Sequence, residues 1–125
     1  MCPQPKAQTV LIVEDDAALR RLYRTALTVE GFAVVTAEDG FDALRSVDLR
    51  RPDAIVLDLG LPRLNGRDVA RELTANAGTH RIPIVVVTGE AADLNEGDFD
   101  CVLRKPVTSD QLIDAVRNCL RNAKR

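Results

Sequence analysis

Residues that could carry out chemistry follow short apolar runs at several places along this sequence. They are Glu14 and Asp15 after residues 10–13, Asp58 after residues 54–57, Thr88 after residues 84–87, and Lys105, which follows residues 102–103 and precedes Pro106. Short apolar runs are typical of buried strands, and the carboxyl ends of parallel strands meet at one edge of a sheet. We therefore expect these side chains to form one cluster, although they lie far apart along the chain.

Several carboxylates in one cluster repel one another, and each is driven towards its neutral form unless a cation balances the charge. Mg2+ typically takes one or two protein carboxylates and keeps waters and a phosphate oxygen as its other ligands. Asp15 and Asp58 are the expected direct ligands. A carboxylate beside such an ion can also attack phosphorus, and Lys105 and Thr88 would then supply positive charge and a hydrogen-bond donor to the phosphoryl oxygens.

Most of these residues also have a simpler interpretation. Asp15 or Asp16 could cap the helix that follows, which is worth about 1 kcal/mol. Thr88 alone is a common residue at the end of a strand, and Lys105 alone is more often a solvated charge. Asp58 has no obvious capping function before residues 59–62. We favour the cluster because the simpler interpretations would all have to hold at once.

Alternating strand and helix patterns indicate the fold class. Strands are predicted at residues 10–13, 32–37, 54–59 and 82–87 and around residues 102–103. Apolar residues spaced by three and four predict helices from Asp15 or Asp16 to Gly31, around residues 41–47, over residues 68–76, and over residues 112–120 after a capping-box pattern at Thr108 and Gln111. This alternation predicts an α/β domain, in which helices cover both faces of a parallel sheet.

Length and composition limit the functions to consider. The chain has 125 residues, which is the usual size of one compact domain, and 17 basic and 19 acidic residues give a net charge of -2. Direct binding to nucleic acid is therefore not expected. No apolar run is long enough for a membrane span, and the amino terminus lacks the apolar core of a signal peptide, so we expect a cytoplasmic protein with reduced cysteines.

Four segments resemble the motifs of bacterial two-component response regulator receiver domains (CheY-like), in the same order. They are Leu-Ile-Val-Glu-Asp-Asp at 11–16, Ile-Val-Leu-Asp-Leu-Gly-Leu-Pro at 55–62, Val-Val-Val-Thr-Gly at 85–89 and Arg-Lys-Pro at 104–106. The resemblance implies a doubly wound (βα)5 flavodoxin-like three-layer sandwich with a five-stranded parallel sheet in the order 2-1-3-4-5. We expect a mobile tail at residues 1–8, the receiver domain at 9–122, and a carboxyl-terminal tail at 123–125.

The resemblance also implies a role for each candidate residue. Glu14 and Asp15 would form the acidic pair that binds Mg2+, with the carbonyl of Gly60 contributing to the metal site. Asp58 would be a metal ligand and would also accept a phosphoryl group from a histidine. Lys105 would contact that group and would precede a cis peptide bond, and Thr88 would move to hydrogen-bond the phosphoryl oxygens.

The function implied is a phosphoacceptor domain that switches protein–protein interactions. The expected partners are a histidine kinase or a histidine phosphotransfer protein, together with an output protein that the sequence does not name. We expect a monomer or a weak dimer that is not an enzyme, except that it assists its own phosphorylation and dephosphorylation.

Three other readings compete with this one. A degenerate receiver would bind partners without phosphorylation, but the acidic pair, Asp58, Thr88 and Lys105 are all present. An enzyme of the haloacid dehalogenase type would carry a second acid where this chain has Gly60. A flavin- or nucleotide-binding module would need a glycine- or serine-rich loop in place of residues 14–16.

The sequence departs from the family between Thr88 and Lys105. Val102 stands where the family usually has an aromatic residue that reports phosphorylation, and the interval from Thr88 to Lys105 is several residues shorter than usual. Residues 91–95 could form about one helical turn. We therefore expect the fourth helix to be short or missing and the readout of phosphorylation to differ from the usual one.

Overall fold

The computed structural model describes residues 7–89, 99 and 101–123, and within them the chain forms one parallel sheet covered by helices. The elements in chain order are β1 (Thr9–Val13), α1 (Ala17–Val29), β2 (Ala33–Ala37), α2 (Gly40–Leu49), β3 (Ala54–Asp58), α3 (Gly66–Ala75), β4 (Ile84–Thr88), β5 (Cys101–Arg104) and α4 (Ser109–Ala123). The strand order is β2-β1-β3-β4-β5, and each neighbouring pair is parallel. The predicted doubly wound fold is therefore confirmed.

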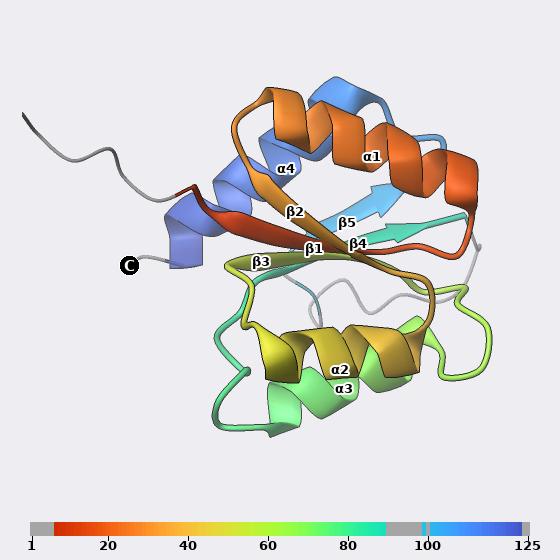
Figure 1. Ribbon diagram of the computed structural model, residues 1–125, viewed down its shortest axis with the longest axis vertical. Helices are drawn as coiled ribbons and strands as arrows, with labels where there is room; N and C mark the ends of the chain where they lie inside the picture. Colours follow the sequence, from red (N-terminus) through yellow and green to blue (C-terminus); the bar gives the residue numbers. More distant parts are fainter. Residues whose placement is uncertain (1–6, 90–98, 100, 124–125) are drawn as a thin grey trace, which may run out of the picture.

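The helices lie in two layers, with α1 and α4 on one face of the sheet and α2 and α3 on the other (Figure 1). Successive strand residues point to opposite faces, so Leu11 and Val13 join the buried cluster beneath α2 and α3, whereas Val10 and Ile12 join the cluster beneath α1 and α4. Burial on both faces explains why the strands read as continuous apolar runs. Residues 91–95, where the fourth helix was expected to be short or missing, lie outside the described residues, and α4 is the helix predicted after Thr108.

Helix α1 begins where the sequence indicates, and the structure decides which aspartate caps it. Asp16 Oδ1 accepts hydrogen bonds from the backbone N–H groups of Ala18 at 2.9 Å and Leu19 at 3.1 Å. Gly31, just beyond the helix, has a φ of 96°, a conformation that favours glycine. Asp16 therefore performs the capping function, and the simpler interpretation of Asp15 does not hold.

The last helix is capped as predicted. The Thr108 Oγ1 accepts from the backbone N–H of Gln111 at 3.1 Å, and the Gln111 Oε1 accepts from the backbone N–H of Thr108 at 2.9 Å. This reciprocal pair is the capping box that the sequence predicts. The peptide bond between Lys105 and Pro106 is cis, as the family resemblance implies.

Two predicted boundaries were wrong by two residues. Helix α3 begins at Gly66 rather than Asp68, because the side chain of Asn65 accepts a hydrogen bond from the Asp68 N–H and caps the helix earlier. Strand β4 begins at Ile84 rather than Ile82, because the Ile82 N–H donates to the Thr79 carbonyl in the preceding turn. Among the described residues, no helix has the length and apolar character to cross a membrane.

Candidate functional site

The acidic pair lies immediately after β1. The Glu14 N–H donates to the carbonyl of Ala37 at 3.1 Å, which continues the pairing of β1 with β2 by one residue. Glu14 is buried, with 1% of the residue exposed, whereas Asp15 is exposed. The chain therefore leaves the sheet after Glu14, so that the Glu14 carboxylate is buried and the Asp15 carboxylate lies at the surface.

Asp58 is the last residue of β3, and the backbone that follows it holds its carboxylate. The Asp58 side chain is buried, and Oδ1 accepts a hydrogen bond from the Gly60 N–H at 2.9 Å. Helix α3 starts close against this turn, since the Gly66 N–H donates to the Leu59 carbonyl at 3.3 Å. A Cβ atom at Gly66 would lie 2.4 Å from the Asp58 carbonyl oxygen, so this close approach requires glycine.

Lys105 follows β5, the strand at one edge of the sheet, and its side chain reaches the acidic residues from there. Its N–H donates to the Thr88 carbonyl at 2.9 Å, which places it at the ends of β4 and β5. Its Nζ donates to Glu14 Oε1 at 2.7 Å and to Asp58 Oδ2 at 3.3 Å. Thr88 itself ends β4 and is buried. One ammonium group therefore links Glu14, one member of the acidic pair, to Asp58.

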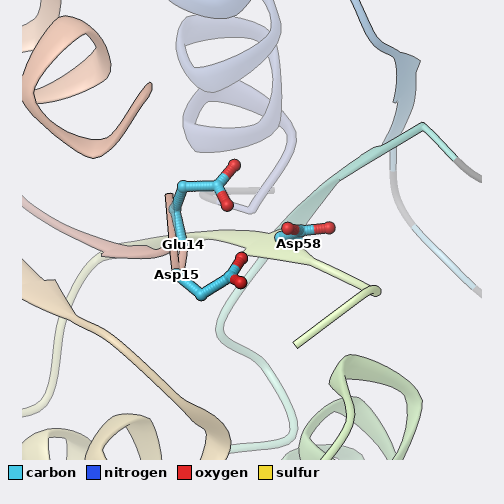
Figure 2. A group of neighbouring side chains, drawn as sticks. All are labelled: Glu14, Asp15 and Asp58. Carbon is cyan, nitrogen blue, oxygen red and sulfur yellow. The ribbon is translucent and has the colours of Figure 1, made fainter. Parts of the chain in front are cut away.

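The three carboxylates converge in the space between the loops that follow β1 and β3 (Figure 2). Ligand oxygens of Glu14, Asp15 and Asp58 all lie within 4.8 Å of one another. Hard divalent cations prefer such all-oxygen donor sets, and the Gly60 backbone lies beside them through its hydrogen bond to Asp58. The residues present therefore fit a Mg2+ site.

The electrostatics of the cluster follow from its burial. Burial raises the pKa of Glu14 from 4.5 to about 7, and the Asp58 carboxylate adds to the rise, while the hydrogen bond from Lys105 opposes it. Burial also disfavours the charged form of Lys105, but its hydrogen bond to Glu14 and the nearby carboxylates outweigh this and raise its pKa. The site thus holds more negative charge than a single ammonium group balances, and it favours a further cation.

Sequence comparison identifies the family. Residues 10–117 match the profile of the response regulator receiver domain. The chain belongs to this family. It is 38% identical over 121 residues to the response regulator MprA of Mycobacterium leprae, with 92% of this chain and 52% of that protein covered, and 37% identical to MprA of Mycobacterium ulcerans, with 92% and 51% covered. The chain therefore spans about half the length of the curated relatives it matches.

Solved receiver domains have the same fold. The signal receiver domain of a signal transduction histidine kinase from Syntrophus aciditrophicus superposes with a TM-score of 0.87 and 26% identity, covering 95% of this chain and 94% of that one. A receiver domain protein from Clostridium thermocellum gives a TM-score of 0.83 with 26% identity, covering 94% of this chain and 97% of that one.

The receiver domain of this chain carries an acidic pocket of Glu14, Asp15 and Asp58. Members of the family are generally signalling modules of two-component systems rather than enzymes.

The receiver domain also contains a site residue that sequence reasoning missed. Arg20, in the first part of α1, donates through Nη1 to the carbonyl of Glu14 at 2.9 Å and to the carbonyl of Asp15 at 3.3 Å. Its Nη2 lies 3.3 Å from Glu38 Oε1. The only sequence signal is an arginine one helical turn after the capping Asp16, and such arginines are common on exposed helix faces.

Proposed function

We propose that this chain is a phosphoacceptor receiver domain that is phosphorylated on Asp58 with the help of Mg2+. The observation that carries the proposal is the buried Asp58 carboxylate, which shares the Lys105 ammonium group with Glu14 and lies with both members of the acidic pair. A carboxylate at a strand end has no structural need for such surroundings. They suit a group that must take on further negative charge and hold it.

The proposed reaction transfers a phosphoryl group from a phosphohistidine of the partner. A carboxylate oxygen of Asp58 attacks the phosphorus, the phosphorus–nitrogen bond breaks, and the imidazole keeps the electron pair and takes up a proton. A Mg2+ ion held by Asp15, Asp58 and the Gly60 carbonyl, with Glu14 beside them, would neutralise the charge on the phosphoryl oxygens. The product is an aspartyl phosphate on the receiver and a neutral histidine on the partner.

Lys105 and Thr88 are proposed to recognise the phosphoryl group once it is attached. The Lys105 Nζ already lies 3.3 Å from Asp58 Oδ2, so it can pair with a phosphoryl oxygen through a small movement. Thr88 ends the neighbouring strand β4, where its hydroxyl can donate a hydrogen bond to a second oxygen after the loop adjusts. The new charge would thereby change the structure that a partner protein meets.

The proposed partners follow from the family and from this chemistry. A histidine kinase or a histidine phosphotransfer protein supplies the phosphoryl group, and an output protein binds according to the phosphorylation of Asp58. We place this exchange in the cytoplasm, with the domain as a monomer or a weak dimer. The domain assists its own phosphorylation and dephosphorylation and has no other substrate.

The proposal is tested by incubating the protein with acetyl phosphate and Mg2+ and measuring its intact mass. We expect one added phosphoryl group on the native chain, no addition on Asp58→Asn, and no addition on the native chain when EDTA removes the metal. Asp48→Asn, which changes an exposed aspartate on α2, is the matched control and should be labelled like the native chain. Equal labelling of Asp58→Asn would place the acceptor elsewhere. An unlabelled native chain would favour the degenerate receiver.

A further inference from the structure

We propose that Arg20 is a positioning residue that sets the direction of the acidic pair for binding a divalent cation. The inference rests on the metal site of the proposed function. It concerns the hydrogen bonds of the guanidinium group to the backbone, where Nη1 contacts the carbonyls of Glu14 and Asp15 at 2.9 and 3.3 Å.

The two carbonyls that Arg20 contacts belong to the peptide planes on either side of the Asp15 Cα. The Glu14 carbonyl is part of the peptide that joins Glu14 to Asp15, and the Asp15 carbonyl is part of the next one. One guanidinium nitrogen that bridges both planes therefore fixes the backbone at Asp15 and the direction in which its side chain leaves. Asp15 is the exposed member of the acidic cluster, so it gains most from a backbone that is held in place.

The other members of the cluster have side-chain restraints of their own. Lys105 holds the Glu14 carboxylate at 2.7 Å, and the Gly60 N–H holds the Asp58 carboxylate at 2.9 Å. Arg20 in turn is anchored on α1, whose first turn is closed by the hydrogen bond from the Arg20 N–H to the Asp16 carbonyl at 2.9 Å. The arginine therefore connects a rigid helix to the turn that carries the acidic pair.

The contact with Glu38 contributes less than the contacts with the carbonyls. The Arg20 side chain is 18% exposed, whereas the Glu38 side chain is 73% exposed. Ion pairs with such an exposed partner are worth about 0–1 kcal/mol. We therefore assign the positioning role to the backbone contacts and treat the ion pair with Glu38 as an accessory.

Positioning and simple electrostatics predict opposite effects of removing Arg20. A positive charge near the site repels a divalent cation, so its loss alone would tighten metal binding. If Arg20 orients the acidic pair, its loss instead weakens metal binding. Residues that orient metal ligands from outside the coordination sphere typically contribute about 10- to 100-fold to affinity.

The test is a calorimetric titration of Mg2+ into the full chain and its variants without a phosphodonor. We expect Arg20→Ala to raise the Kd for Mg2+ by about tenfold or more. Arg20→Lys keeps the charge but loses the planar fork, and we expect a rise of several-fold. Glu38→Gln should stay within about twofold of the native chain, because only the exposed ion pair is lost. Arg24→Ala, which removes an exposed arginine one turn further along α1, should leave the Kd unchanged or slightly lower.

An unchanged or lower Kd in both Arg20 variants would overturn the inference, and so would a native chain that binds no Mg2+. An equal loss of affinity in Glu38→Gln would assign the effect to the ion pair and would also overturn it. Thermal unfolding in EDTA checks that the variants are folded, and Arg20→Lys decides the question if Arg20→Ala does not fold. A native chain that binds Mg2+ but takes no label on Asp58 would refute the proposed function while leaving this inference intact.

Discussion

At the scale of single residues, Glu14 shows that burying a carboxylate in the site affects the stability of the folded protein. Glu14 is 1% exposed, its carboxylate shares Lys105 with Asp58, and burial raises its pKa to about 7. The folded protein therefore holds Glu14 in a setting that favours the protonated form, whereas the unfolded chain ionises it near pH 4.5. This difference makes the stability of the metal-free protein depend on pH.

Glu14→Gln should remove that dependence. A folded-state pKa above the unfolded value gives a contribution to stability that is complete below pH 4.5 and is lost as the pH rises through about 7. In EDTA, the free energy of unfolding of Glu14→Gln minus that of the native chain should therefore rise between pH 5 and pH 8. The expected gain is on the order of 1 to 3 kcal/mol, because one unit of pKa corresponds to about 1.4 kcal/mol.

Urea denaturation of both proteins across this pH range measures the difference directly. Parallel stability curves would show that Glu14 titrates normally and would contradict the account of its burial. Adding Mg2+ should reduce the advantage of Glu14→Gln at pH 8, because the native chain alone keeps the full acidic pair.

Sequence reasoning predicted the residues of the site better than the contacts that hold them. Glu14, Asp58 and Lys105 were predictable because each lies at the end of a strand, and strand ends in a parallel sheet meet at one edge. Arg20 was not predictable, because its role depends on a side chain that folds back from a helix to the backbone before it. Which aspartate caps α1 was also left open, since Asp15 and Asp16 are equally good capping residues.

At the scale of elements, the loop from β3 to α3 shows how close packing positions Asp58. Arg63 in this loop has a φ of 67°, which is uncommon for a residue other than glycine. Its guanidinium group contacts Asp39 at 3.2 Å and lies over the ring of Phe41, at 5.4 Å from its centre. The loop is therefore attached to the start of α2 at one point and to α3 through Gly66 at another.

Gly66→Ala should disturb this loop although alanine is the better helix former. An added Cβ would lie 2.4 Å from the Asp58 carbonyl oxygen and 2.6 Å from the Leu59 Cα, so the backbone beside the acceptor must move. We expect a loss of about 1–3 kcal/mol in unfolding free energy, measured with urea, and slower labelling by acetyl phosphate. Gly78→Ala is the matched control, because its nearest neighbour is a flexible side-chain atom of Asn76 at 3.3 Å. A Gly66→Ala protein as stable and as quickly labelled as the native chain would contradict this view of the loop.

The same loop explains why element boundaries were harder to predict than element types. The type of each element follows from apolar spacing, which extends over many residues. A boundary depends on single hydrogen bonds, such as the one from the Asp68 N–H to the Asn65 side chain that starts α3. Asn65 was not considered as a capping residue, so the start of the helix was placed at Asp68.

At the scale of the whole molecule, strand order decides which side chains can meet. β1 pairs directly with β3, so the acidic pair and Asp58 are neighbours. β5 is separated from β3 by β4, and neighbouring strands lie about 4.8 Å apart, so a residue after β5 needs a long side chain to reach Asp58. The lysine at position 105 meets this requirement, and its contacts with Glu14 and Asp58 reach from the end of β5 past β4 to the ends of β1 and β3.

The central claim is that the loops after β1 and β3, which are distant in sequence, form one site for one divalent cation beside Asp58. Crystals of the protein soaked with Mn2+, a substitute for Mg2+ that is visible by anomalous scattering, test this claim most directly. We predict a single strong peak at the carboxyl edge of the sheet, about 2.0–2.4 Å from oxygen atoms of Asp15, Asp58 and the Gly60 carbonyl. A peak that contacts Asp15 without Asp58, or no peak at this edge in fully soaked crystals, would contradict the account.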